Sequence, residues 1–440
     1  MSVRCEVEPN RCSVPRTIGV LEAEAAGPTL IVIGGVHGNE PTGVRAAEKV
    51  ISRLNSNGQI ARGRCVALTG HRRALADPDG HTRYLEEDLN RLFTPERVKE
   101  ALRCNRQSLS PDMIELAEIV ACLEAEAERA RGPMYLIDIH TFSSRGTPFA
   151  ATEDAIRARR FCRGFGLPMV LGFEEELHGL LSDYFTNRFG GVSVVVEAGR
   201  HGEQAAERIA EATLMRALEL TGLIEPGIEA LEVLKKAAGA RAGRIYDVRY
   251  RHVIKNPDFK MLDRVHSFAR VHVGEHVADE GGCAQRTPES GLMFMPNRQK
   301  HKRPGDDGYF IVRRVGGVWL ALSAWLRDRA WIHRALPRFL PGVRRRGASG
   351  HELLVSPQIA AVMKRDLFHL LGYRLVRHDG ELHLNRARRL AVGMQAIVRS
   401  VGLMLAGLVA GGERRILAEE SPQDWIVRRH HLDVLDEQDS

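Results

Sequence analysis

Short β-branched apolar runs alternate with helix-like stretches along the first half of the chain. Each run has the length of a buried strand, and each intervening stretch is long enough for a crossover helix, so we expect parallel strands. The strand candidates are Thr29–Ile33, Arg64–Thr69, Met134–His140, Pro168–Phe173 and Val192–Glu197. The helix candidates are Pro41–Leu54, Pro111–Arg131, Ala155–Phe165 and Glu203–Leu220. The pattern predicts an α/β fold whose mostly parallel sheet has helices on both faces.

Two of these predicted strands are followed by side chains that bind metals in other proteins. His37 and Glu40 follow the first strand in the run G-G-V-H-G-N-E-P-T-G, and His140 ends a later strand two residues after Asp138. Ligands of open α/β sheets bind at the carboxyl ends of strands, where these side chains would gather. Either histidine alone is as well explained as an ordinary loop or core residue, but their joint occurrence favours a metal site. Two His and one Glu would leave Zn²⁺ an open position for water, and Asp138 could orient His140.

The same residues carry a family resemblance. The chain resembles the succinylglutamate desuccinylase and aspartoacylase family, relatives of the zinc carboxypeptidases, in four segments between Gly34 and Gly199. The likeness thins beyond about Pro226, and nothing after about Val315 is recognisable. The matching residues are Gly35, His37, Gly38, Asn39 and Glu40, then Arg83, Tyr84, Asp88, Leu89, Asn90 and Arg91, then Asp138 and His140, and last Val194, Val195, Val196 and Glu197.

The resemblance implies a zinc-carboxypeptidase-like fold, one Zn²⁺ per chain held by His37, Glu40 and His140, and a zinc-bound water that attacks an amide. Glu197, which directly follows three valines, would be the general base. Arg83 would stabilise the negative oxygen that forms in the reaction.

Substrate-binding residues follow from the same resemblance. Asn90 and Arg91 would bind a free carboxylate of the substrate, because a guanidinium and an amide supply a planar set of donors. Arg188 would be a further carboxylate-binding arginine, with Tyr184 one helical turn before it. Seen in isolation, Asn90 and Arg91 could instead flank a helix that begins after Thr94-Pro95, and the arginines could be solvated surface charges.

Composition suggests three parts in these 440 residues. Glu225-Pro226-Gly227 breaks the last helix of the first part, and from about Arg244 the sequence becomes alternating and rich in turns. We predict a zinc hydrolase catalytic domain over 1–225, a small β domain over 226–315, and a basic, Trp-containing α+β extension over 316–440 whose role is unknown. A further helix over 356–373 and a hairpin around Asp379-Gly380 are expected in this extension.

The basic charge is concentrated in one segment. Residues 297–346 hold thirteen Lys or Arg and three Asp, a net charge of +10, whereas the whole chain carries +7. Three of the four tryptophans, Trp319, Trp325 and Trp331, lie in the same segment. This segment could contact an anionic membrane surface or nucleic acid, or it could be an ordinary helix that packs its tryptophans and leaves its arginines in water.

The cellular location and the activity can be predicted from these observations. Seven scattered cysteines without a C-x-x-C pair, a polar amino terminus and no run of about 20 apolar residues indicate a cytoplasmic protein without a transmembrane segment. We expect a zinc-dependent amidohydrolase that removes the acyl group from a small carboxylated N-acyl amino acid. The alternatives are a zinc carboxypeptidase acting on peptides, or a membrane-binding or nucleic-acid-binding protein acting through its basic carboxyl-terminal region. The sequence does not specify the acyl group, the amino acid or the oligomeric state.

Overall fold

The computed structural model describes residues 13–57, 60–300, 302–327, 329, 331–332, 343–346, 352–355, 368–377 and 425–429. Within them, eleven strands form one large sheet. They are β1 (Thr17–Glu22), β2 (Thr29–Gly34), β3 (Arg64–Thr69), β4 (Met134–Phe142), β5 (Phe149–Ala151), β6 (Met169–Leu171), β7 (Val192–Arg200), β8 (Ile245–Val253), β10 (Arg270–Val271), β13 (Gly291–Phe294) and β14 (Asp307–Val315). Their order across the sheet is β1-β3-β2-β4-β7-β5-β6-β8-β14-β13-β10.

The centre of this sheet is parallel, as predicted. Strands β3, β2, β4 and β7 run in the same direction, and the edge strand β1 is antiparallel to β3. Strand β2 shows why helices must cover both faces. Its residues Leu30 and Val32 belong to one hydrophobic core, whereas Ile31 and Ile33 belong to another. Alternate side chains of a strand point to opposite faces, so this all-apolar strand is buried on both sides.

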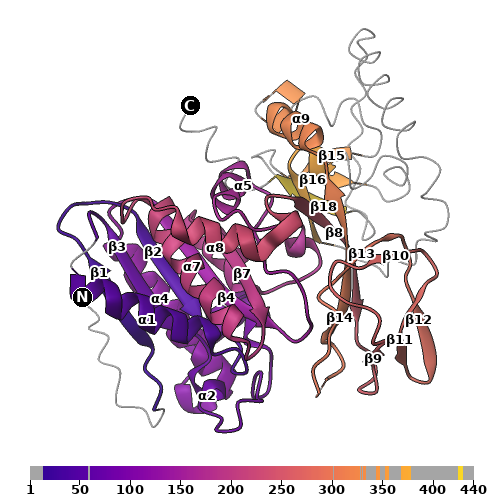
Figure 1. The fold of residues 1–440 in the computed structure, drawn as a ribbon, viewed down its shortest axis with the longest axis horizontal. Coiled ribbons are helices and arrows are strands. Elements are labelled where there is room, and N and C mark those ends of the chain that lie inside the picture. The colour runs from indigo at the N-terminus through magenta and orange to yellow at the C-terminus, as the bar shows by residue number, and fades with distance from the viewer. Residues whose placement is uncertain are drawn as a thin grey trace.

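Helices supply the two cover layers. Figure 1 shows α1, α7 and α8 side by side over one face of the sheet. The core of the opposite face is shared with α3, α4 and α6. The helices of these two layers are α1 (Thr42–Asn57), α7 (Gln204–Leu220) and α8 (Glu229–Ala238), then α3 (Pro95–Arg103), α4 (Pro111–Arg129) and α6 (Leu181–Phe189). Two shorter helices are α2 (Arg72–Leu75) and α5 (Ile156–Arg163).

The large sheet continues into the region predicted to be a small β domain. Strand β8 pairs parallel with β6 and antiparallel with β14, and β13 and β10 follow. A separate three-stranded sheet is formed by β9 (Lys260–Met261), β11 (His276–Glu280) and β12 (Cys283–Arg286). The division at residues 225 and 315 stays a prediction. The structure adds that α8, just beyond residue 225, packs on α7 and shares the core of the first region.

Among the described residues of the extension are helix α9 and a small sheet. Helix α9 (Gly317–Arg327) carries Trp319 and Trp325, of which Trp325 is 53% exposed. The four-stranded sheet has the order β15-β16-β18-β17, formed by Val343–Arg346, Glu352–Val355, Trp425–Arg429 and Tyr373–Arg377. Most of the helix predicted over 356–373 and the turn at Asp379-Gly380 lie outside the described residues. No helix among the described residues is both long enough and apolar enough to cross a bilayer.

Candidate active site

The glycine-rich run after β2 makes the turn that delivers His37 and Glu40. Gly35 has a φ of 71°, a backbone conformation that glycine adopts without strain. A Cβ on Gly34 would lie 2.4 Å from the backbone carbon of Gly43, so the start of α1 approaches the end of β2 more closely than any other residue would allow. The chain therefore folds back at once, and the side chains of His37 and Glu40 are turned toward the end of β4.

His37, Glu40 and His140 form one buried cluster. Nδ1 of His37 lies 3.0 Å from Oε1 of Glu40, and Nδ1 of His140 lies 2.9 Å from Oε2. Their candidate ligand atoms all lie within 4.8 Å of one another, and each residue is at most 4% exposed. Burial raises the pKa of Glu40, but the two imidazoles outweigh it and hold that pKa well below its usual value. Two imidazoles and a carboxylate that converge out of water could hold a metal ion.

Carboxylates orient both histidines from behind. Oδ1 of Asp88 lies 3.0 Å from Nε2 of His37, and Oδ2 of Asp138 lies 2.9 Å from Nε2 of His140. Burial lowers the pKa of His140, whereas Asp138 and Glu40 raise it, so the pKa lies well above its usual value. In both rings the Nδ1 atom faces Glu40 and the Nε2 atom faces a second carboxylate. The contact with Asp88 is a hydrogen bond, whereas that with Asp138 is an ion pair without hydrogen-bond geometry.

Glu197 lies on β7 directly beside this cluster. It is the register partner of His140 on the neighbouring strand and is 7% exposed. Its Oε2 has no hydrogen-bond partner among the described residues. Burial raises the pKa of Glu197 to about 8, with Glu40 adding to the shift and His140 opposing it. The site therefore holds a carboxyl group that has an oxygen available for a substrate or water molecule.

Arg83 contacts the cluster of His37, Glu40 and His140. Its Nη1 donates to Oε1 of Glu40 at 3.1 Å, and its Nη2 donates to Oδ2 of Asp88 at 3.4 Å. His201, one residue beyond β7, lies within 2.7 Å of the Thr141 hydroxyl and also lines the site. Sequence reasoning did not identify His201, although it follows a buried strand as His140 does.

Asn90 and Arg91 lie on the short 3₁₀ helix η1 (Leu89–Arg91). Oδ1 of Asn90 accepts a hydrogen bond of 2.9 Å from the backbone N–H of Leu181. Nη1 of Arg91 donates to the carbonyl of Asn90 at 2.7 Å, and its Nη2 donates to Oδ2 of Asp307 at the same distance. Both side chains line the same cavity as His37 and His140, so the structure brings them to one site.

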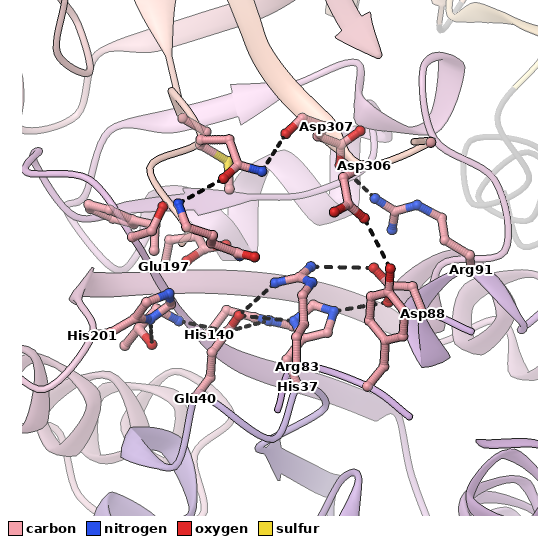
Figure 2. Close-up of a pocket in the computed structure, with 18 of the residues that line it drawn as sticks. His37, Glu40, Arg83, Asp88, Arg91, His140, Glu197, His201, Asp306 and Asp307 are labelled. Atoms are coloured by element: carbon pink, nitrogen blue, oxygen red, sulfur yellow. Dashed lines mark hydrogen bonds and ion pairs between the residues drawn. The ribbon is translucent and has the colours of Figure 1, made fainter. Parts of the chain in front are cut away.

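Two aspartates from the opposite wall were not predicted. Figure 2 shows Asp306 and Asp307 across the pocket from His37 and Glu40. Asp306 accepts a hydrogen bond of 3.1 Å from the Tyr84 hydroxyl. These aspartates are two of the three acidic residues in the basic segment 297–346, an exception in that segment that could have drawn attention to them.

These side chains surround a cavity of about 390 Å³ that is lined from both walls. An adjoining cavity shares His37, His140 and Glu197 with it and extends between β5 and η3 (Phe173–Glu175). This volume suits a small molecule that places one end at His37, Glu40 and His140.

Tyr184 and Arg188 are not brought to this site, and here the expectation requires correction. Both lie on α6, whose first N–H groups face Asn90, so one and two further turns carry them away from the cavity. The ring of Tyr184 packs against Phe93 and Phe189. Arg188 is 56% exposed in its side chain and pairs with Glu124 on the surface at 2.9 Å.

Known proteins resemble this chain in its first half. The sequence model of the succinylglutamate desuccinylase/aspartoacylase catalytic domain matches residues 26–221. The succinylglutamate desuccinylase of Vibrio parahaemolyticus is 35% identical over 80 residues, which are 17% of this chain. That stretch is 22% of the length of the Vibrio protein, so the alignment spans about a fifth of that relative.

Solved structures share the fold over a longer stretch. A succinylglutamate desuccinylase/aspartoacylase from Rhodobacter sphaeroides superposes with a TM-score of 0.51 at 19% identity, covering 66% of this chain and 87% of that one. The ectoine utilization protein EutE from Ruegeria pomeroyi superposes with a TM-score of 0.50 at 18% identity, covering 67% and 87%. Residues 26–221 are thus similar in sequence to the succinylglutamate desuccinylase/aspartoacylase catalytic domain, and the solved structures share the fold.

Proposed function

We propose that the protein is a zinc-dependent amidohydrolase that removes the acyl group from an N-acyl amino acid. The observation that carries the proposal is the buried convergence of His37, Glu40 and His140 beside a fourth side chain, Glu197, in one cavity. A buried cluster of this kind is expensive to keep unless a cation compensates it. The relatives named above as desuccinylases and aspartoacylases support the class of reaction.

The donor set fits zinc. Two imidazole nitrogens and one carboxylate are ligands that zinc takes in hydrolytic sites. His37 and His140 would bind through Nδ1, because their Nε2 atoms already face Asp88 and Asp138. Zinc, when bound, would act as a Lewis acid toward the amide carbonyl and would favour the charged form of Glu197.

Glu197 would act as the general base and then as the general acid. Its unpartnered Oε2 would accept a proton from the attacking water, and the carboxyl group would pass this proton to the leaving nitrogen. Burial keeps the affinity of this carboxylate for a proton high, as its raised pKa shows. A group that both takes and returns a proton at neutral pH needs such an intermediate pKa.

Arg83 and Arg91 would have different roles in the reaction. Arg83, held by Glu40 and Asp88, would donate to the oxygen that becomes negative when the carbonyl is attacked. A guanidinium has five N–H donors, so Arg91 has donors beyond those used by Asn90 and Asp307. Asn90 and Arg91 would therefore bind the carboxylate of the amino acid.

Metal analysis paired with a panel of N-acetyl and N-succinyl amino acids tests the proposal. We expect close to one zinc per chain and release of a free amino acid that stops when a chelator removes the metal and resumes when zinc is returned. No zinc binding, or equal release without metal, would refute it. A peptide that is blocked at its amino terminus tests the alternative function. A carboxypeptidase would release the last residue of this peptide and leave a shortened peptide.

A further inference from the structure

The carboxyl-terminal extension inserts two arginines into the wall of the catalytic region. Arg327 ends α9 and Arg374 lies on β17, and they are 1% and 6% exposed. Arginine side chains are rarely buried unless carboxylates compensate them. Both of these reach Asp154, which follows β5 and is itself 1% exposed.

Arg327 joins two segments that are far apart in the sequence. Its Nη2 donates to Oδ2 of Asp154 at 2.8 Å and to the carbonyl of His369 at 2.7 Å, and its Nη1 donates to the carbonyl of Asp154. A Cβ on Gly372 would lie 2.9 Å from Nε of Arg327, so the chain passes directly over this guanidinium. The buried guanidinium of Arg327 thus connects the extension to Asp154 of the catalytic region.

Arg374 and its neighbour His369 reach a second segment of the wall. Arg374 donates to Asp154 and lies 3.6 Å from carboxylate oxygens of both Glu174 and Glu175. Nε2 of His369 lies 2.6 Å from Oε1 of Glu175. These glutamates belong to η3, the short helix after β6. Figure 1 shows this part of the extension above β8, whose Asp247 also contacts Arg374 at 3.4 Å.

The segments held in this way also line the cavity. Thr152 and Glu153, directly before Asp154, form one part of its surface, and Phe173 and Glu174 form another. Strand β5 pairs with β7 so that Phe149 is the register partner of Glu197. A shift of Asp154 or of η3 would therefore change the wall that faces the proposed general base.

Charge compensation makes the extension necessary for this wall. The carboxylates of Asp154, Glu174, Glu175 and Asp247 meet here. Four arginines of the described part of the chain contact members of this group, namely Arg159, Arg249, Arg327 and Arg374. Two of those four arginines come from the extension. Burial raises the pKa of Asp154, but Arg159, Arg327 and Arg374 outweigh it and hold the pKa well below its usual value. Without Arg327 and Arg374, several carboxylates would repel one another out of water.

We infer that Arg327 and Arg374 are positioning residues for the substrate pocket, and that α9 and residues 368–377 complete the catalytic domain by fixing the wall formed by Thr152–Asp154 and Phe173–Glu175. The effect on substrate binding rests on the proposed function, whereas the effect on the wall does not. The two effects can therefore be measured separately.

Arg374→Met removes the charge and keeps much of the side-chain volume. In the full-length variant, we expect faster amide hydrogen exchange in peptides that cover 149–155 and 171–177, with unchanged exchange over 134–142, the strand of His140. We also expect KM for the best N-acyl amino acid to rise about 10-fold or more, with zinc content unchanged and a smaller change in kcat. Arg314→Met, which removes an exposed arginine of β14, is the matched control and should change neither property.

The outcomes separate the inference from the proposed function. Unchanged exchange in both wall peptides, or faster exchange with an unchanged KM, overturns the inference. If Arg374→Met does not fold, Arg327→Lys serves instead, because it keeps the charge but loses the fork that joins Asp154 to His369. If the wild-type protein hydrolyses none of the substrates, the proposed function fails, and the exchange comparison alone decides whether the extension holds the wall.

Discussion

The two walls of the pocket are both built from buried charges, yet they differ in what compensates those charges. On the wall formed by β2, β4 and β7, Glu40 lies between two imidazoles, and Oε2 of Glu197 has no partner among the described residues. On the wall formed by η3 and the segment after β5, Asp154 is met by three arginines of the same chain. We propose that a bound cation completes the first wall, whereas three arginines hold the pKa of Asp154 on the second wall well below its usual value.

This difference distinguishes buried charges that bind a ligand from buried charges that hold the structure together. Buried charges that the chain itself compensates hold segments together, whereas buried groups that converge without a sufficient partner indicate where a ligand belongs. The contact between Arg91 and Asp307 lies between these cases, because the guanidinium is held by an aspartate of β14 and also faces the cavity. Substitutions on each wall can test whether the distinction is real.

The largest effect should come from Glu197→Gln. The amide keeps the shape of the side chain but cannot take a proton, so kcat should fall by about 10² to 10⁴-fold while zinc content stays near one per chain. Steady-state kinetics with metal analysis measures both quantities. Glu203→Gln, at an exposed position six residues later, is the control. Unchanged turnover in Glu197→Gln would remove this residue from the mechanism and weaken the contrast between the walls.

The next largest effects should come from Arg83→Ala and Arg91→Ala, and they should fall on different kinetic constants. Arg83→Ala should lower kcat by about 10² to 10³-fold, as the loss of an oxyanion donor does. Arg91→Ala should instead raise KM by roughly 10 to 100-fold, because a charge-assisted hydrogen bond to a substrate carboxylate is lost. Full kinetic curves for both variants decide the matter. If both changes appear only in KM, Arg83 binds substrate and does not stabilise the reaction's negative oxygen.

A smaller effect, on zinc affinity, is expected for Asp138, which lies beside His140. Asp138→Asn should weaken zinc binding by about 10 to 100-fold, because His140 loses the carboxylate that orients its ring. Competition with a zinc chelator of known affinity measures the change. Asp279→Asn disturbs a similar carboxylate–histidine pair with His276 on the protein surface, and it should leave zinc affinity unaltered. Equal effects from the two variants would contradict the assignment.

The sequence predicted the first wall far better than the second. The parallel strands β2, β3, β4 and β7 follow from periodicity, and His37, Glu40 and His140 lie at strand ends in a local pattern. The second wall depends on contacts such as Arg374 with Asp154, which are 220 residues apart. An arginine that will be buried has no local signature that distinguishes it from a solvated one, so the sequence did not predict the contacts of Arg327 and Arg374.

Arg188 was expected in the substrate site but lies on the surface, and its substitution should give the smallest effect. The family resemblance implied a substrate contact for Arg188, but Asn90 contacts the start of α6, and the helix then carries Arg188 outward to Glu124. Arg188→Ala should therefore leave KM unchanged and should lower the free energy of unfolding by less than about 1 kcal/mol, the usual range for an exposed ion pair. Glu124→Gln, which breaks the same pair from the other side, should give the same result. A rise in KM with Arg188→Ala alone would mean that this arginine turns into the pocket when substrate binds, and that the compensated surface around the site is less fixed than the contrast between the walls implies.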